Sequence, residues 1–307
     1  MSRGGRPTLR HRLEFAAYRG VAALVGRLPE SWALAVGSFL GWLAGGVVGI
    51  RRSVVDVNLK RSFPDRDPPW RHGVAVESYR HLGREAVMTL RLARADAGDV
   101  VGRTRFEGEA EEMIRRASGG GVVCVTGHLG NWEVGGSAVA ARGVRVEAVA
   151  FRQRNPLFDR ELVESRGRLG LGIIPRGHAR ARVPRALRDG ALVALVGDQN
   201  AGRSGIFVEF LGRPASTARG PALFSIRTGA PLFAAVCLAE PGRPRRYVLH
   251  CEEIRAEPTG DLDEDVRRLT RAHTDFLARF VHRAPEQYFW QHKRWKTRPG
   301  DGRRTPV

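Results

Sequence analysis

Residues 121–133 read Gly-Val-Val-Cys-Val-Thr-Gly-His-Leu-Gly-Asn-Trp-Glu, and this stretch decides the fold. Its apolar start, rich in β-branched residues, predicts a buried strand that ends at a glycine. The strand delivers His128 to a glycine-flanked turn. Glu133 then falls in the first turn of the next helix, where the helix dipole favours a carboxylate that can face the imidazole. A histidine and a carboxylate placed in this way have the layout of a general base and its orienting partner.

The spacing of this pair is weak evidence by itself. A chain with 9 histidines and 32 acidic residues has about one such pair by chance. The alternative interpretation makes His128 a capping or core histidine. The strand before the histidine and the glycines around it favour the functional interpretation.

Composition places the chain among globular proteins with one large domain or two smaller ones. Its 307 residues are 42% hydrophobic, which is enough to bury a large core. The three cysteines make no disulfide framework, and Cys124 and Cys237 lie in apolar runs, as reduced core residues do. The sequence therefore predicts a reducing compartment.

The charge of the chain points to anionic partners. A net charge of +19 attracts nucleic acid, anionic lipid headgroups or an acidic carrier protein. Nucleic acid is disfavoured because aromatic residues make up only 7% of the chain and no RNP, KH or zinc-finger signature is found. The lack of a Gly-x-Ser-x-Gly motif disfavours a serine hydrolase, and the scattered histidines disfavour a zinc hydrolase.

The first 50 residues are predicted to associate with a membrane. Residues 13–27 fit a basic amphipathic helix, and residues 32–50 run for 19 positions without a charge, long enough to span a bilayer. Five glycines in that run and arginines on both flanks favour a helix or hairpin lying in one leaflet over a span, with a core helix as the third alternative. The spacing of Gly37, Gly41 and Gly45 allows close helix packing in each case.

From residue 51 the pattern becomes that of an α/β domain. Helices are expected at 54–63, at 69–96 as one or two helices, and at 107–117, 132–142, 156–169, 179–189, 218–229 and 261–284. Strands are expected at 122–126, 146–151, 171–174, 191–197, 207–210, 232–238 and 247–251. This alternation predicts an α/β fold with a mixed, mostly parallel sheet flanked by helices. The predicted organisation is a membrane-associating segment at 1–50, the α/β domain at 51–298 and a basic tail at 299–307.

Further candidate residues follow or lie within other predicted strands. Arg152 comes after the strand at 146–151 and is either an anion-binding residue or a solvated loop arginine. Asp198 follows the strand at 191–197; it is either a turn residue or a partner facing His128, because ligand sites of open α/β sheets gather at the carboxyl ends of strands. Glu209 alternates with apolar residues and is either a solvent-facing strand residue or a partner for His128. Residues 285–296 combine aromatic and basic side chains, which suits either an interfacial surface or a packed C-terminus.

Several motifs together resemble one known family, the bacterial lipid A biosynthesis (late) acyltransferases, which include the mycobacterial phosphatidylinositol mannoside acyltransferases. The matches run in family order over roughly residues 20–298, and a single one would be weak. They are Asn58-Leu59 before Phe63-Pro64, the His-x4-Glu motif at 128–133, Arg152 with Asn155-Pro156, Arg166-Gly167-Arg168, Gly197-Asp198-Gln199, residues 207–217, Arg227 to Pro231 and Pro285 to Trp290.

The resemblance implies a glycerolipid-acyltransferase-like fold and an O-acyltransferase on the cytoplasmic face of the inner membrane. By position it makes His128 the general base and Glu133 the motif carboxylate, and it assigns substrate binding to Arg152, Asn155, Arg166 and Arg168. One branch of the family uses a separate glutamate to hold the histidine, and Glu209 is the candidate here.

The resemblance also implies the partners. The donor is a thioester, acyl-ACP (acyl carrier protein) or acyl-CoA. The acceptor is a glycolipid, with a lipid A precursor first and a phosphatidylinositol mannoside second. No metal, cofactor or nucleic acid is expected. The alternative from another class is a non-catalytic basic protein that binds membrane surfaces.

Overall fold

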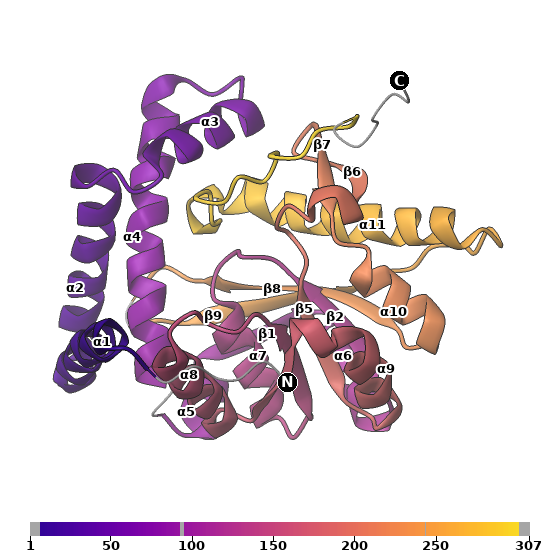
Figure 1. Cartoon of the computed structure of the whole chain (residues 1–307), viewed down its shortest axis with the longest axis horizontal. Coiled ribbons are helices and arrows are strands. Elements are labelled where there is room, and N and C mark those ends of the chain that lie inside the picture. Colours follow the sequence, from indigo (N-terminus) through magenta and orange to yellow (C-terminus); the bar gives the residue numbers. More distant parts are fainter. Residues whose placement is uncertain (1–6, 93–94, 243, 301–307) are drawn as a thin grey trace.

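A seven-stranded sheet forms the centre of the computed structural model, which describes residues 7–92, 95–242 and 244–300 (Figure 1). The strand order is β1-β9-β8-β2-β5-β3-β4, and every neighbouring pair is parallel except β8 and β9. The strands are β1 Thr104–Gly108, β2 Val122–Thr126, β3 Val146–Ala150, β4 Leu171–Pro175, β5 Leu192–Val196, β8 Leu232–Ala239 and β9 Tyr247–Glu253. The predicted mixed, mostly parallel sheet is confirmed.

Strand β2 lies inside the sheet, between β5 and β8, because its residues are apolar on both faces. Val123 and Val125 belong to one hydrophobic cluster, and Val122 and Cys124 belong to another. The first cluster packs helices α9 Ala179–Arg188, α10 Gly220–Thr228 and α11 Leu262–Arg283 against the sheet. The second packs α5 Ala97–Gly102, α6 Ala110–Gly119 and α7 Trp132–Ala141 on the opposite face. Helix α8 Pro156–Arg168 connects β3 to β4.

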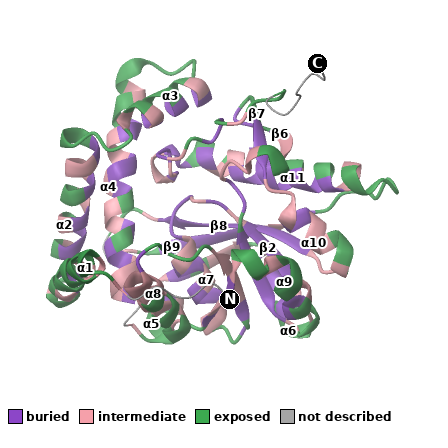
Figure 2. Cartoon of the chain, viewed as in Figure 1, coloured by how far each residue is buried: buried purple, intermediate pink, exposed green. Residues whose placement is uncertain are grey.

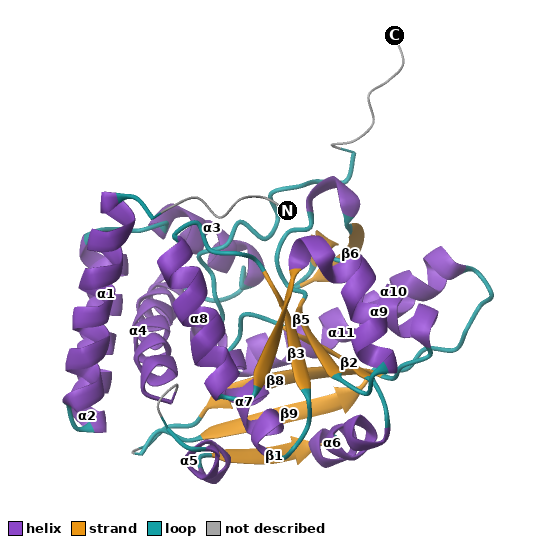
Figure 3. Cartoon of the chain, turned by 60° about the horizontal axis from the view of Figure 1, so that its bottom comes forward, coloured by secondary structure: helices purple, strands orange, loops and turns teal. Residues whose placement is uncertain are grey.

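The N-terminal helices form a layer at one end of the sheet, where α1, α2 and α4 stand side by side (Figure 3). They are α1 Leu9–Arg27, α2 Glu30–Trp42 with a π-helical turn at Leu43–Val47, α3 Arg52–Ser62 and α4 Pro68–Leu92. The predicted glycine contacts are present: a Cβ added at Gly41 would overlap the carbonyl oxygen of Tyr79, and one at Gly83 would overlap that of Gly37. Glycine therefore lets α2 and α4 approach closely.

Helices α1 and α2 leave large apolar side chains exposed, including Leu13, Trp32 and Phe39. In Figure 2 both ribbons have green stretches, which mark exposed residues. Among the described residues no single helix is both long and apolar enough to cross a membrane. The pair Glu30–Val47 and Arg52–Ser62, bent by 89°, meets the length and composition test together.

Two short strands are not predicted from the sequence, and they change the predicted elements beside them. The helix expected from residue 107 begins at Ala110, because 107–108 close strand β1, an edge strand that was not predicted. The strand predicted at 207–210 is β6 Ile206–Phe210, which pairs with the unpredicted β7 Arg213–Thr217 in a separate two-stranded sheet. Most of the predicted basic tail, 301–307, lies outside the described residues. The three cysteines, Cys124, Cys237 and Cys251, are free and buried.

Candidate active site

The sheet register brings two sequence candidates together. Strands β2 and β5 are parallel neighbours, and Thr126 at the end of one pairs with Val196 at the end of the other. His128 and Asp198 each follow two residues later, at the same edge of the sheet. Two residues 70 positions apart therefore meet because their strands are adjacent and in register.

Asp198 binds His128 twice. Its Oδ1 lies 2.7 Å from the imidazole Nδ1, and its Oδ2 accepts the backbone N–H of the same histidine at 2.9 Å. A carboxylate only accepts, so Nδ1 carries a proton and Nε2 of the neutral ring is an acceptor. The Asp198 side chain is 3% exposed and that of His128 is 21% exposed, so the carboxylate is buried while one side of the ring remains accessible.

The contact between His128 and Asp198 also shifts the pKa of each residue. Burial by itself lowers the pKa of His128, but the charge and hydrogen bond of Asp198, together with the charge of Glu133, outweigh it and raise that pKa. Burial likewise raises the pKa of Asp198, yet the charge and hydrogen bonds of His128 leave it below its usual value. The carboxylate therefore stabilises an imidazolium that forms when Nε2 takes up a proton.

Aromatic rings and an amide surround the imidazole. Trp132 meets it edge-on with ring centroids 4.7 Å apart, and the Phe289 centroid lies at 5.8 Å. The backbone N–H of Phe289 also donates to the carbonyl oxygen of His128 at 2.9 Å, which joins the C-terminal segment to the turn that carries His128. The Gln199 amide nitrogen lies 3.4 Å from Nε2.

The orienting role expected of Glu133 belongs, by contact, to Asp198. Glu133 sits in the first turn of α7 as predicted, but its carboxylate pairs with Arg166 of α8. Arg166 Nε donates to Oε2 at 3.0 Å and Nη2 donates to Oε1, so both oxygens are held by one guanidinium fork. The helical geometry explains the difference, because α7 carries the side chain toward α8 and Asp198 occupies Nδ1.

The other predicted residues are more dispersed. Asn155 caps α8 by accepting the N–H of Leu157, and its amide donates to the His11 carbonyl oxygen, so it ties α1 to α8. Arg152 is exposed in the loop after β3. Arg168, at the end of α8, lies 3.8 Å from Glu161. Glu209 is exposed on β6, opposite Pro214, as the solvent-facing interpretation requires.

Sequence reasoning missed a buried carboxylate, that of Glu85, which contacts the turn that follows His128. Glu85, in the middle of α4, accepts hydrogen bonds from Asn131 at 2.9 Å and Tyr247 at 2.8 Å, and it forms an ion pair with Arg245 at 2.7 Å. Asn131 in turn caps α7 through the N–H of Val134. Nothing in the local pattern of α4 marks Glu85, because these partners lie on two distant segments, at residue 131 and at residues 245–247.

The described residues were also compared with the requirements of a metal site, which needs several ligating side chains close together. Among residues 7–92, 95–242 and 244–300, no group of three or more His, Cys, Asp or Glu side chains could hold a metal ion.

The chain is similar to known acyltransferases. The family model of bacterial lipid A biosynthesis acyltransferases matches residues 3–297. The lipid A biosynthesis palmitoleoyltransferase of Escherichia coli K12 is 27% identical over 286 residues, covering 91% of this chain and 90% of that protein. The phosphatidylinositol mannoside acyltransferase of Mycolicibacterium smegmatis is 27% identical over 319 residues, covering 99% and 98%. The chain therefore belongs to the bacterial lipid A biosynthesis acyltransferase family and is an enzyme that transfers acyl groups.

Proposed function

We propose that this enzyme moves a fatty acyl chain from a thioester donor to a hydroxyl of a glycolipid, with His128 as the general base. The observation that carries the proposal is the buried Asp198 on Nδ1, which leaves Nε2 of the partly exposed ring as an acceptor. Nε2 takes the hydroxyl proton while the oxygen attacks the thioester carbonyl carbon. The C–S bond then breaks, and the imidazolium returns its proton to the leaving thiolate.

The residues around the base supply positioning and charge. The Gln199 amide beside Nε2 can donate to a substrate oxygen. Arg152 follows β3, which pairs with β5 and so ends at the same sheet edge, where a cation would bind an acceptor phosphate or the oxyanion. The paired Glu133 and Arg166 hold α7 and α8 together beside the base. A base in this position contributes about 10²–10⁴-fold in rate.

The surface supports a location at the cytoplasmic face of the inner membrane, where thioester donors are available. Exposed apolar side chains on α1 and α2 fit helices that lie in one leaflet. The net charge of +19 suits anionic lipids and an acidic acyl carrier protein, with acyl-CoA as the other donor. The family assignment disfavours the non-catalytic membrane-surface alternative.

Two acceptors follow from the relatives. A lipid A precursor is the first, in line with the family model and the E. coli enzyme. A phosphatidylinositol mannoside is the second, because the mycobacterial relative aligns over 99% of this chain.

The test is acyl transfer in detergent micelles. Labelled acyl-ACP and acyl-CoA are each offered with a tetra-acylated lipid A precursor and with a phosphatidylinositol mannoside. We expect wild-type activity with one pair and its loss in folded His128→Ala, while His178→Ala, which changes an exposed histidine, stays active. Full activity of His128→Ala would overturn the mechanism. Inactivity of the wild type with all four pairs would overturn the substrate assignment.

A further inference from the structure

A cationic groove lies between α3 and the C-terminal segment 293–298. Its volume is about 320 Å³. It is lined by Ser53, Val54, Val57, Asn58, Arg61, Lys293, Trp295, Lys296 and Arg298. Four of these nine residues are cations and none is acidic, so the lining of the groove carries an excess of positive charge.

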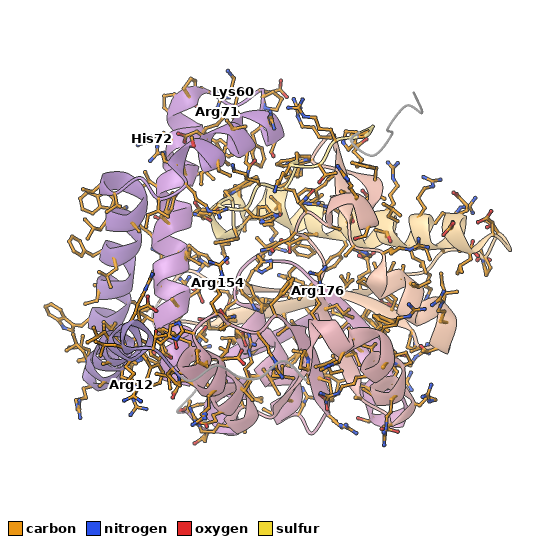
Figure 4. All side chains as sticks on the ribbon, viewed as in Figure 1. Arg12, Lys60, Arg71, His72, Arg154 and Arg176 are labelled. Atoms are coloured by element: carbon orange, nitrogen blue, oxygen red, sulfur yellow. The ribbon has the colours of Figure 1, made fainter. Side chains whose placement is uncertain are left out.

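The lysines of the chain concentrate at this groove. Of 51 basic residues only three are lysines, namely Lys60, Lys293 and Lys296. Two of them line the groove, and Lys60 is on α3, at the end of the molecule where Figure 4 labels it. An ammonium is a compact charge with three donors and binds phosphate without the fixed approach that a guanidinium fork requires.

An apolar rim, of which Val57 also lines the groove, is exposed on α3 and on the turn before it. Val47 and Val48, at the turn that leads from α2 toward α3, are 63% and 65% exposed, and Ile50 and Val57 are exposed as well. Arg51 in the same turn donates to the Gln291 carbonyl oxygen at 3.1 Å, which fixes the rim against the C-terminal segment. Exposed apolar side chains next to a cationic pocket match an amphiphile with an anionic head.

We propose that this groove binds the phosphodiester headgroup of an anionic phospholipid, with the rim of Val47, Val48, Ile50 and Val57 in the acyl region. The proposal adds a lipid site outside the catalytic dyad and rests on the proposed membrane association. An acidic carrier protein could pair with the cations, but it would leave the valines and Ile50 exposed to water. A phospholipid would bury these apolar side chains as well, so the rim favours a lipid.

The position of the groove connects the lipid to catalysis. The segment that forms its floor also bears His292, whose Nε2 accepts the N–H of Asn200, and Arg294, which donates to Ser216 and Thr217. Asn200 lies two residues beyond Asp198. A headgroup in the groove would therefore seat the sheet edge that carries the dyad close to the bilayer surface.

Vesicle sedimentation tests the site with the full chain. The vesicles are pure phosphatidylcholine or phosphatidylcholine with phosphatidylglycerol. The variant is Arg61→Gln/Lys293→Gln/Lys296→Gln, and the matched control is Arg180→Gln/Arg182→Gln/Arg188→Gln, which removes the same charge from exposed positions on α9. Each cation near an anionic bilayer is worth about fivefold in partitioning, so we expect a loss of about 100-fold for the groove variant on anionic vesicles and less than tenfold for the control.

Further measurements distinguish a phospholipid headgroup from free phosphate, and they distinguish this proposal from the proposed acyl transfer. Inorganic phosphate at millimolar concentration should not displace the wild type from anionic vesicles, and displacement would identify a free-anion site and overturn the lipid assignment. Equal losses in both variants would also overturn it, since they would show a general charge effect. A raised KM for acyl-ACP with unchanged vesicle binding would make the groove a carrier site instead. Acyl transfer in micelles reports separately on the proposed function, through His128→Ala.

Discussion

The exchange Asp198→Asn removes one charge from the dyad and keeps the shape of the side chain. Asp198 accepts from the ring Nδ1 at 2.7 Å and from the backbone N–H of His128 at 2.9 Å. Asparagine has a single acceptor oxygen. If the backbone keeps that oxygen, the amide N–H₂ faces Nδ1, the proton moves to Nε2, and the base loses its acceptor.

The magnitude follows from the charge that the imidazolium loses. Two unit charges about 4 Å apart attract by about 4 kcal/mol at an effective dielectric constant of about 20, and the 3% exposure of Asp198 limits screening by water. At about 1.4 kcal/mol per factor of ten, kcat should fall about 10³-fold. The fold should persist, because the packing around residue 198 keeps its volume.

The assay is the initial rate of acyl transfer as a function of pH. Burial lowers the pKa of His128 but Asp198 more than compensates, so kcat/KM of the wild type should rise with pH through a pKa above the usual 6.5, as the base becomes neutral. In Asp198→Asn the acid limb should move to lower pH. Glu209→Gln, on an exposed strand face, is the matched control and should leave rate and profile unchanged. A kcat of Asp198→Asn within about threefold of wild type, with the acid limb in place, would refute the reasoning.

Arg166→Met leaves the carboxylate of Glu133 without its guanidinium; kcat/KM should drop about 10- to 100-fold, with partial recovery in Arg166→Lys, and equal rates in all three proteins would argue against the pairing. Glu85→Gln strands Arg245 in the interior and should lower the free energy of unfolding by about 3–5 kcal/mol in urea denaturation; a loss below about 1 kcal/mol would contradict the buried-pair description. Gly130→Ala should abolish activity or soluble expression, because φ is +65° and a Cβ would overlap a carbonyl oxygen of β8; an active, stable variant would show that the turn can relax.

Sequence patterns predicted every strand inside the sheet and missed two short strands, β1 at one edge and β7 outside the sheet. Strand β2 is apolar on both faces, and its limits were predicted without error. Strand β1 reads Thr-Arg-Phe-Glu-Gly and lies at the sheet edge, where one side has no neighbour and charged residues are tolerated. Strand β7 contains Pro214 and exists because the hairpin pairs it with β6.

The site residues also include some that the sequence could predict and some that it could not. The strand-end rule named both His128 and Asp198, since parallel neighbours end at one edge. It could not rank Asp198 against Glu133 or Glu209, because the choice depends on the direction in which α7 and β6 carry their side chains. Glu85 could not be predicted from the sequence, because its burial depends on hydrogen-bond donors that are distant in the sequence.

The buried cysteines have a practical consequence for studying this enzyme. Burial raises the pKa of Cys124 to about 12 and also raises the pKa of Cys237 and Cys251. Because the thiolate is the reactive form, maleimides should not label the folded native chain at neutral pH, and the thioester donor should not exchange its acyl group onto these thiols. The substitution Ser53→Cys, at an exposed and uncharged position that lines the groove, would provide the single reactive thiol. A fluorophore or spin label there would report the depth of the groove in a bilayer without removal of any native cysteine.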